Sequence, residues 1–433
     1  MMRKYSFLLL LAVLAVGVFL RVFGINASYG FEGELGRELI YLRSNFLAGR
    51  LPLAGLTTSH EWLSYGPFYY WIMMPIFAIF KGDPFILFWT ALGVSILGLI
   101  LNYAVVKKIV DQKTAFISTF FEAISPLLVW QTRLSKLHVF FFILMPVFMY
   151  LSYLVWNEKK KWVFWLGLVF GFMFSFHFSQ IPIIGVIILM FWIKKNIYSF
   201  KDWLKFAAGT ILPNVTLLWP DKNLILWLPY RTLNIADKNP VGTFTSLSEF
   251  FGRSLFWDSR FWILGFVVFI LLFGYYVWLN RRNLKKDFLS FYLISSLGLV
   301  LTANILHGGS PVHYFLPIFT LVPIFYAIFI SKIKLGILLP VLIFALNFSG
   351  YFSSGIVGGF VAYQKQLEAA NFIVSDANGK KLSIERSGQY DYFPEQYSQN
   401  YEYLILWKGG YLVENSTNVY KIVENNGNVE VEK

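Results

Sequence analysis

Cysteine, charge and histidine are all scarce in this sequence. None of its 433 residues is cysteine, which excludes a disulfide framework, cysteine-ligated zinc and a thiol nucleophile. Charged residues make up only 14%, whereas soluble domains carry about 25%. Because most of the chain has so little charge to present to water, the composition indicates an integral membrane protein. The five histidines are scattered, and we predict neither a metal site nor a required cofactor.

Apolar residues are abundant instead. They make up 57% of the chain, and aromatic residues alone make up 20%, a composition that suits lipid-facing helices with Trp and Tyr at the membrane interfaces. The net charge of +13 comes from Lys and Arg that stand mostly in short clusters between apolar runs. Because this pattern follows the positive-inside rule, we attribute the positive charge to membrane topology and expect no nucleic-acid partner.

Long apolar runs alternate with the basic clusters. Most runs approach the roughly 20 residues that a helix needs to cross a bilayer. We predict eleven transmembrane helices, at residues 5–24, 84–106, 114–131, 137–156, 162–178, 181–193, 203–219, 260–280, 287–306, 314–331 and 335–353. The predicted fold class is an all-α polytopic membrane protein of the cell membrane with a small C-terminal α+β domain.

The basic clusters set the predicted orientation. If all of them are cytoplasmic, eleven spans place the N-terminus inside and the C-terminus outside. This parity requires that the apolar run 67–80 does not cross. With about 14 residues it is short for a span, and we interpret it as a helix at the outer surface. The clusters are at residues 107–113, 159–161, 194–201, 281–286 and 332–334.

Two loops and the C-terminal segment are predicted to lie outside the membrane. The membrane domain covers residues 1–353, with external loops at 25–83 and 220–259. Residues 354–433 are polar and rich in turn residues, which predicts a small extracytoplasmic domain of unassigned role. Its predicted elements are a helix at 363–374, strands at 381–386, 401–407 and 418–424, and turns at Gly409-Gly410 and Asn426-Gly427.

The strongest chemical signal lies in the first external loop. Carboxylates so close to a membrane are costly unless they are paired or useful. Apolar residues recur with helical spacing from Leu35 to Phe46, which predicts a helix that begins near Glu34. The acidic residues are consistent with a catalytic role and also with stabilisation of the helix N-terminus. The charged residues are Glu32, Glu34, Arg37 and Glu38, and the glycines that allow a backbone or a ligand to approach closely are Gly30, Gly33 and Gly36.

Further motifs follow in chain order. They are Gly66-Pro67-Phe-Tyr69-Tyr70-Trp71, Gly82-Asp83-Pro84, Ser125-Pro126, Gln131-Thr-Arg133, Phe-His177-Phe-Ser-Gln180 and His313-Tyr314-Phe-Leu-Pro317. Together with residues 31–38, they resemble the glycosyltransferase family 39 group, which includes protein O-mannosyltransferases and aminoarabinose transferases of the GT-C fold class. The resemblance covers roughly residues 1–350 and omits the C-terminal domain. It implies a membrane glycosyltransferase of hexosyltransferase type with a lipid-phosphate-sugar donor.

The resemblance also implies a catalytic base. In that family an acidic residue of the first external loop acts as base, usually Asp in a stretch similar to Asp-Gln-Gly-Arg-Asp. Glu34-Leu-Gly-Arg37-Glu38 matches this stretch with both Asp replaced by Glu. Glu34 is therefore the implied base and Glu38 the second acid, with Glu32 as the alternative base.

The implied reaction moves a sugar from a polyprenyl phosphate to an acceptor hydroxyl. Because phosphate is already a good leaving group, the main requirement is a carboxylate that takes the hydroxyl proton. A single displacement inverts the anomeric carbon, whereas retention needs a second carboxylate about 5 Å away. The resemblance favours inversion. The implied partners are the lipid-linked sugar, membrane lipids and an acceptor that is a protein, a lipid or a glycan.

The donor phosphate needs cations at the outer surface. Each candidate could instead be a cation near a helix end that extends to the membrane interface. The predicted phosphate-binding residues are Arg37, Arg133, Lys136 and His313, with Arg231 and Arg253 as further options. The predicted substrate-binding residues are Tyr69, Tyr70, His177 and Tyr314. His138 and His177 are also consistent with buried, hydrogen-bonded helix residues.

Other classes of protein remain as alternatives. A transporter or flippase would carry ionisable groups near the middle of the bilayer, whereas the charges here gather towards the outer surface. A non-catalytic scaffold for envelope glycans would need no acidic external loop. A further alternative is an oligosaccharide ligase or an oligosaccharyltransferase, and the latter would typically use a divalent metal and more external acids. A membrane glycosyltransferase is therefore the first hypothesis.

Overall fold

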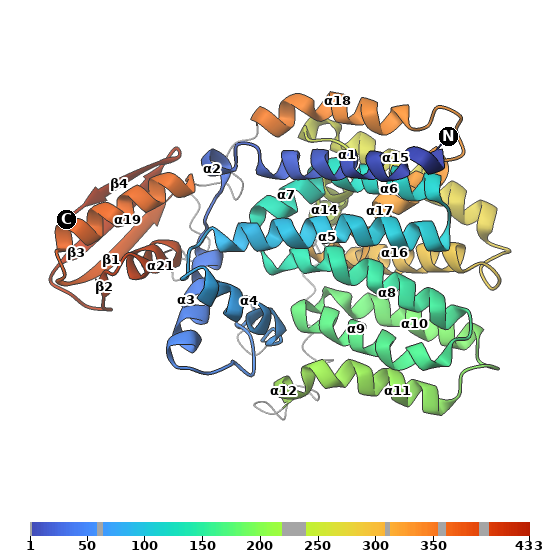
Figure 1. Ribbon diagram of the computed structural model, residues 1–433, viewed down its shortest axis with the longest axis horizontal. Coiled ribbons are helices and arrows are strands. Elements are labelled where there is room, and N and C mark those ends of the chain that lie inside the picture. The colour runs from blue at the N-terminus through green and yellow to red at the C-terminus, as the bar shows by residue number, and fades with distance from the viewer. Residues whose placement is uncertain (1, 59–63, 219–239, 308–311, 354–360, 389–397) are drawn as a thin grey trace.

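The computed structural model describes residues 2–58, 64–218, 240–307, 312–353, 361–388 and 398–433. It is a long helical bundle with a small α+β domain at one end (Figure 1). The N-terminus lies at the opposite end of the bundle from that domain. Arg231 and the first part of the predicted loop 220–259 lie outside the described residues.

The bundle helices coincide with the apolar runs of the sequence. They are α1 (Met2–Val22), α5 (Ile86–Ile109), α6 (Gln112–Ile124), α7 (Pro126–Leu134), α8 (Phe141–Trp156), α9 (Val163–Phe176), α10 (Ile181–Ile193), α11 (Phe200–Ile211), α15 (Trp262–Asn280), α16 (Phe288–His307), α17 (Leu321–Ile330) and α18 (Leu338–Ser353). In the described part of the chain, four helical segments are long and apolar enough to cross a membrane, or five if the bent pair 312–318 and 321–330 is one span. The count of eleven spans therefore stays a prediction.

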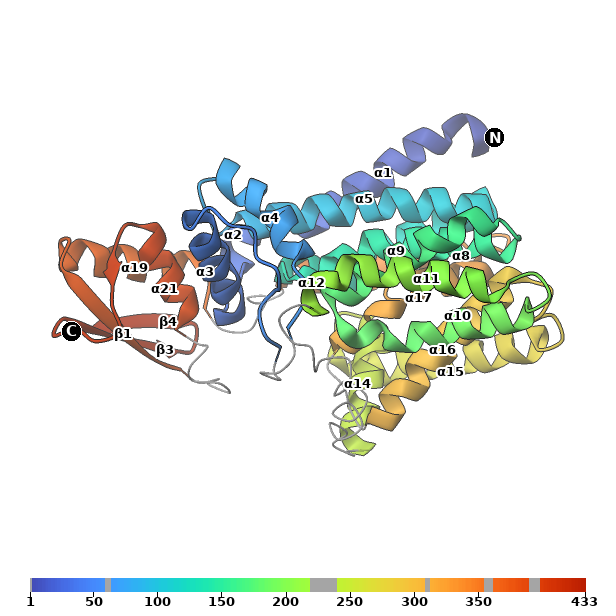
Figure 2. The same cartoon turned by 90° about the horizontal axis from the view of Figure 1, so that it is seen from below.

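Short helices gather at the end of the bundle that faces the small domain (Figure 2). They are α2 (Ile25–Ser28), α3 (Gly33–Leu47) and α4 (Phe68–Ile79) of the first external loop, α12 (Val215–Leu218) just before the second, and α14 (Pro240–Arg253) within the second. At 1.5 Å per residue, the 12 residues of α4 span about 18 Å. This is well short of the roughly 30 Å hydrocarbon core of a bilayer. That α4 lies at the membrane surface stays a prediction.

A break divides the predicted span 114–131 into α6 and α7. Ser125 has an extended backbone and Pro126 begins α7, because proline disfavours helical geometry at the residue before it. Pro126 has no N–H to donate to the carbonyl of Glu122. Arg21 Nη2 donates to that carbonyl at 3.4 Å, and Arg21 Nη1 donates to Ala123 O at 2.8 Å. A fully buried arginine thus satisfies the backbone groups that the break frees.

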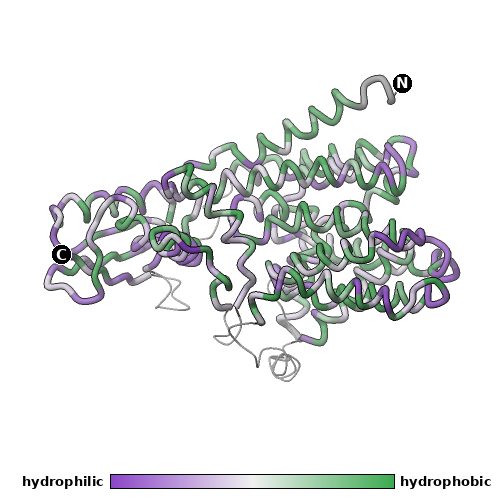
Figure 3. Tube along the Cα trace, turned by 60° about the horizontal axis from the view of Figure 1, so that its bottom comes forward, coloured by the Kyte–Doolittle hydropathy of each residue, from purple (hydrophilic) through white to green (hydrophobic). Residues whose placement is uncertain are grey.

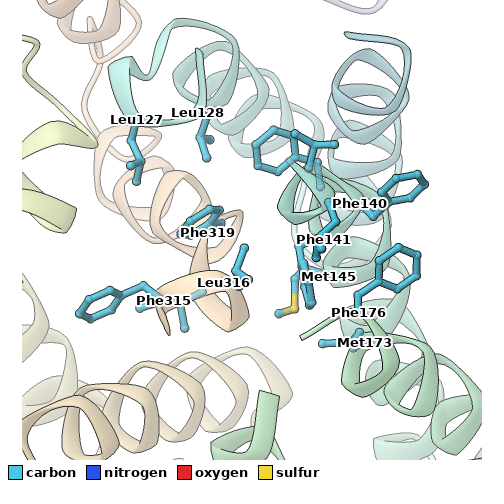
Figure 4. Packing of buried hydrophobic residues seen from close by; sticks show 14 of the residues in the cluster. Leu127, Leu128, Phe140, Phe141, Met145, Met173, Phe176, Phe315, Leu316 and Phe319 are labelled. Atoms are coloured by element: carbon cyan, nitrogen blue, oxygen red, sulfur yellow. The ribbon is translucent and has the colours of Figure 1, made fainter. Parts of the chain in front are cut away.

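Apolar side chains from several helices fill the bundle near this break (Figure 4). They come from α7, α8, α9, the two short helices η1 (Leu137–Phe140) and η6 (Val312–Ile318), and the turn after η6. Phe250 of α14 stacks on Phe315, with ring centroids 4.4 Å apart. The labelled residues are Leu127, Leu128, Phe140, Phe141, Met145, Met173, Phe176, Phe315, Leu316 and Phe319, all of them buried.

The C-terminal domain contains a four-stranded sheet in the order β2-β1-β3-β4. Its elements are α19 (Tyr363–Ala377), β1 (Lys381–Gly388), α21 (Gln399–Trp407), β2 (Tyr411–Leu412), β3 (Val419–Asn425) and β4 (Asn428–Glu432). β1 pairs in parallel with β2 and β3, and β3 pairs antiparallel with β4. The β3–β4 turn is the predicted Asn426-Gly427, where both residues have positive φ.

One predicted strand is wrong. Residues 401–407 form most of the helix α21. Tyr401 and Tyr403 suggest strand alternation, yet Leu404 and Ile405 are buried as well. α21 lies between the sheet and α3, so it is covered on two sides. Burial on two sides removes the periodicity that would distinguish a helix from a strand.

The basic clusters lie at the end of the bundle away from the C-terminal domain, as the hydropathy colouring shows (Figure 3). Lys194 Nζ lies 3.7 Å from Glu158 Oε1. Lys113 Nζ donates to Ile333 O at 3.1 Å. Loops predicted to share one side of the membrane therefore meet in space. That this side is cytoplasmic stays a prediction.

Candidate active site

One lysine joins two carboxylates of the first external loop. Lys136 Nζ lies 2.6 Å from Glu32 Oε1 and 2.6 Å from Glu34 Oε2. Glu32 is the N-cap residue of α3, and Glu34 stands in its first turn. Lys136 follows α7, where Ser135 reverses the chain with a φ of 59°. The fold therefore brings three of the predicted site residues together.

The shared lysine affects the two carboxyl groups differently. It holds the pKa of Glu34 below its usual range, whereas burial raises the pKa of Glu32 in spite of the same lysine. The side chain of Glu34 is 43% exposed and that of Glu32 is 17% exposed. Glu34 is thus the carboxylate that is both ionised and accessible.

Glu38 lies one turn further along α3 and is buried. The hydroxyl of Tyr70 in α4 donates to Glu38 Oε2. Burial raises the pKa of Glu38 to about 7, against the opposing effect of this hydrogen bond. The ring of Tyr69 packs edge-on against Tyr70, with centroids 5.1 Å apart. The two tyrosines predicted as substrate contacts are therefore buried and pack around Glu38.

Arg37 lies between these carboxylates in the sequence and is partly buried. It interacts favourably with the charged forms of both Glu34 and Glu38. Its Nε is buried and has no hydrogen-bond partner among the described residues. Buried guanidinium nitrogens normally have a partner, so Arg37 has a donor to offer to an anion.

Three histidines from separate elements meet next to the ion pair. His138 belongs to η1, His177 follows α9 and His313 belongs to η6. Their ring centroids are 5.1 to 5.3 Å apart. Lys136 and Glu34 both act electrostatically on His313, so the histidines border the carboxylates. Across the described residues, no group of three or more His, Asp or Glu is arranged to hold a metal ion.

Two tyrosines flank the histidines. The ring centroid of Tyr314 is 5.1 Å from that of His313, and that of Tyr65 is 5.7 Å from that of His177. The loop residue Gly66 places Tyr65, since a Cβ at Gly66 would lie 1.6 Å from Ser175 Oγ. Only glycine lets the loop come this close to α9.

Two predicted phosphate-binding cations are engaged elsewhere. Arg133 is 1% exposed, and its Nη2 donates to the carbonyls of Leu20 and Phe23 at 2.7 and 2.9 Å. It is thus directed at the C-terminal end of α1. The guanidinium of Arg253 lies between two indoles, 4.4 and 4.6 Å from the ring centroids of Trp130 and Trp262. Both arginines hold helices together.

Sequence reasoning missed several residues of this site. Tyr65 had no signal other than its place before Gly66-Pro67. His138 was interpreted as a buried helix residue, and it is buried, but beside the other two histidines. His307 lies at the end of α16, with its ring centroid 5.1 Å from that of Tyr314. Only their positions in space connect these residues.

Comparisons with known proteins match this architecture. Residues 64–219 match the family described as dolichyl-phosphate-mannose-protein mannosyltransferase. The chain is similar in structure to ArnT from Cupriavidus metallidurans bound to undecaprenyl phosphate, with a TM-score of 0.65 and 11% identity over 96% of this chain and 93% of that chain. No curated protein matches the sequence.

A second solved structure has the same fold. It is the archaeal oligosaccharyltransferase AglB from Archaeoglobus fulgidus in complex with an inhibitory peptide and a dolichol-phosphate. The TM-score is 0.57 and the identity 12%, over 96% of this chain and 65% of that chain. This chain therefore spans slightly less than two thirds of the length of AglB. The shared fold and the family match together confirm the predicted resemblance: this is a membrane protein of the GT-C fold, similar to the glycosyltransferase family 39 group.

Proposed function

We propose that this protein is a membrane glycosyltransferase that moves a sugar, of hexose type, from a polyprenyl phosphate to an acceptor hydroxyl on the outer face of the membrane. One observation carries the proposal: Lys136 bridges Glu32 and Glu34 at the end of the bundle next to the C-terminal domain. A base for the hydroxyl and a cation for the phosphate thus lie in one place. The lipid phosphates bound to ArnT and AglB support the donor class.

Glu34 is the proposed base. Its carboxylate is the more exposed of the two, and Lys136 keeps it ionised. A carboxylate must be both charged and within reach to accept a proton from a hydroxyl. Glu32 is more buried and its pKa is raised, so it is the second choice. With one accessible carboxylate, single displacement and inversion are favoured over a covalent intermediate.

Lys136 is proposed to change partners during the reaction. When the donor phosphate takes the ammonium group, Glu34 loses the charge that lowers its pKa. The carboxylate then becomes a stronger base when the sugar is in place. Arg37, with its unused Nε, and His313, beside the ion pair, are proposed as further donors to the phosphate. We propose that no metal is required, so transfer should persist in a chelator.

The test is sugar transfer from radiolabelled polyprenyl-phosphate hexoses in membranes that contain the full chain. Glu34→Gln should lower the rate by about a hundredfold to ten-thousandfold, the usual contribution of a general base. The matched control is Glu158→Gln, because Glu158 pairs with Lys194 in one of the basic clusters at the other end of the bundle. Loss of activity in Glu32→Gln alone would move the base to Glu32. No transfer by the wild type with any donor would favour a transporter or a scaffold.

A further inference from the structure

The C-terminal domain is hydrogen-bonded to the segment that carries the acidic residues. Tyr363 N donates to Tyr29 O at 2.9 Å. Asn400 Nδ2 donates to Phe31 O at 3.1 Å. Phe31 is fully buried and directly precedes Glu32. Two backbone carbonyls just before the candidate base are thus held from outside the membrane domain.

Both N–H groups of the Asn400 amide are in use. Besides Phe31 O, Nδ2 donates to Gln366 Oε1 at 2.8 Å. Gln366 Nε2 in turn donates to Val361 O at 2.9 Å. Both amide side chains are buried, so losing either contact would leave a polar group without a partner. This chain of hydrogen bonds fixes α21 to α19 and to the acidic segment at once.

Gly36 accounts for the close fit of the two parts. A Cβ at this position would lie 2.3 Å from Gln399 O and 2.4 Å from Asn400 N. These are backbone atoms of α21 that a rotamer change cannot move aside. The glycines of the acidic segment were predicted to admit a backbone or a ligand, and Gly36 admits the backbone of α21.

The start of α3 has no cap of its own. Its N-cap residue Glu32 makes no side-chain hydrogen bond to the first turn, since its carboxylate is directed at Lys136. A first turn without a cap frays readily. The position of Glu34 therefore depends on contacts from outside the helix, and Asn400 and the Gly36 contact supply them.

We propose that the C-terminal domain holds the base in place and that Asn400 is the positioning residue. This inference rests on the proposed role of Glu34. Asn400 fixes Phe31 O, Phe31 fixes the entry into α3, and the first turn then presents Glu34 to Lys136. Displacing reacting groups by about 1 Å can slow a reaction by about a hundredfold.

The same interface offers a matched control. Tyr403 also belongs to α21 and is also buried, and its hydroxyl donates to Gly82 O. Gly82 lies after α4, in a different segment from Glu34. The ring of Tyr403 packs against that of Phe31, with centroids 6.3 Å apart, and Tyr403→Phe keeps this ring contact. The variant therefore removes a hydrogen bond between the domains and leaves the hydrogen bond to the acidic segment intact.

The experiment compares the full chain as wild type, Asn400→Ala and Tyr403→Phe in lipid nanodiscs. Transfer kinetics give kcat and the KM for the donor, and hydrogen exchange with mass spectrometry reports on backbone amides 32–36. In Asn400→Ala we expect kcat to fall by about tenfold to a hundredfold, with KM within about twofold of wild type. Amides 32–36 should exchange faster in Asn400→Ala only. Tyr403→Phe should keep kcat and KM within about twofold.

The proposal would be overturned if Asn400→Ala kept the kcat and the exchange rates of the wild type. It would also be overturned if Asn400→Ala and Tyr403→Phe lowered kcat equally. If Asn400→Ala does not fold, Gly36→Ala replaces it, because its Cβ displaces α21 while the amide remains; unchanged kcat and exchange there would also overturn the proposal. If the wild type transfers no sugar, the proposed function fails. The exchange rates still decide whether Asn400 holds the segment.

Discussion

Two basic side chains, those of Lys136 and Arg21, lie close to α7, yet they bind different groups. Lys136 contacts two carboxylates, and one of them, Glu34, is 43% exposed. Arg21 is fully buried, and its guanidinium donates to Gly17 O at 3.0 Å and to Ala123 O at 2.8 Å. Glu122, which is also buried, lies beside Arg21.

The difference separates the proposed chemical role of Lys136 from the structural role of Arg21. Backbone carbonyls at a helix break cannot leave, so the contacts of Arg21 are fixed. A lysine shared between two carboxylates can exchange one of them for a phosphate. Ionisable groups within a membrane domain often mark a transport pathway. Here, the carbonyls freed by the α6–α7 break explain why a buried arginine is present at position 21.

The largest expected effect comes from removing the exchangeable cation. Lys136→Met should lower transfer by about a hundredfold to a thousandfold, as when one donor to a developing charge is lost. The amount of folded protein should stay near that of the wild type, because the site is partly exposed. Initial rates together with size-exclusion profiles check this. A variant with normal rates would contradict a catalytic role for Lys136.

Arg21→Met should lower the stability of the protein and leave the kinetics of the folded protein nearly unchanged, the opposite of what is expected for Lys136→Met. Several buried backbone carbonyls would lose their donor, and the buried Glu122 would lose the positive charge beside it, which should cost about 3 kcal/mol or more of stability. The KM of the remaining folded protein should change little, because Arg21 does not contact the ion pair. Thermal unfolding in detergent measures the first effect. A stable protein without activity would show that Arg21 takes part in the chemistry.

The pH dependence should reveal the exchange of partners. Lys136 lowers the pKa of Glu34 in the free enzyme, so kcat/KM should fall only when the pH drops well into the acid range. With the phosphate on Lys136, the pKa of Glu34 rises, and kcat should fall at a pH that is higher by about 1 unit. Profiles of both parameters from pH 4 to 8 provide the measurement. Coincident acid limbs would show that Lys136 keeps its partner.

The smallest expected effect concerns Glu38. Its pKa of about 7 is set mainly by burial, and the hydrogen bond from Tyr70 opposes that rise. Tyr70→Phe removes the hydrogen bond, so the pKa of Glu38 should rise further, by about 1 unit or less. Difference infrared spectroscopy should then show the protonated carboxyl band persisting to higher pH. Glu38→Gln identifies the band, and an unmoved band would contradict the assigned cause.

The sequence predicted the parts of this protein that depend on local pattern. Every predicted run overlaps a helix, because apolar length is a local property. The break at Pro126 was not predicted, although the proline was visible, because hydropathy runs unchanged through it. Residues 401–407 were assigned wrongly because contacts from two sides bury four of the seven positions, among them the consecutive residues 403–405.

For the candidate site too, the residues could be predicted from local sequence, whereas the contacts between distant residues could not. Glu32, Glu34 and Lys136 were each named from their positions in the sequence, but 102 positions separate Glu34 from Lys136, so their contact could not be predicted. Asn400 carries no signal of its own, because an asparagine in a polar stretch usually faces water. Its partner, the carbonyl of Phe31, is a backbone group that no side-chain pattern marks.

The contact between Phe31 and Asn400 also imposes an order of events on biosynthesis. The two residues stand 369 positions apart, which at typical translation rates is about 20 to 70 s of synthesis. During that interval the acidic segment and α3 have been synthesised, but Asn400, which contacts them, has not. If Asn400 holds Glu34 in place as proposed, sugar transfer becomes possible only late in synthesis, once residues 400 and 31 lie on the same side of the membrane.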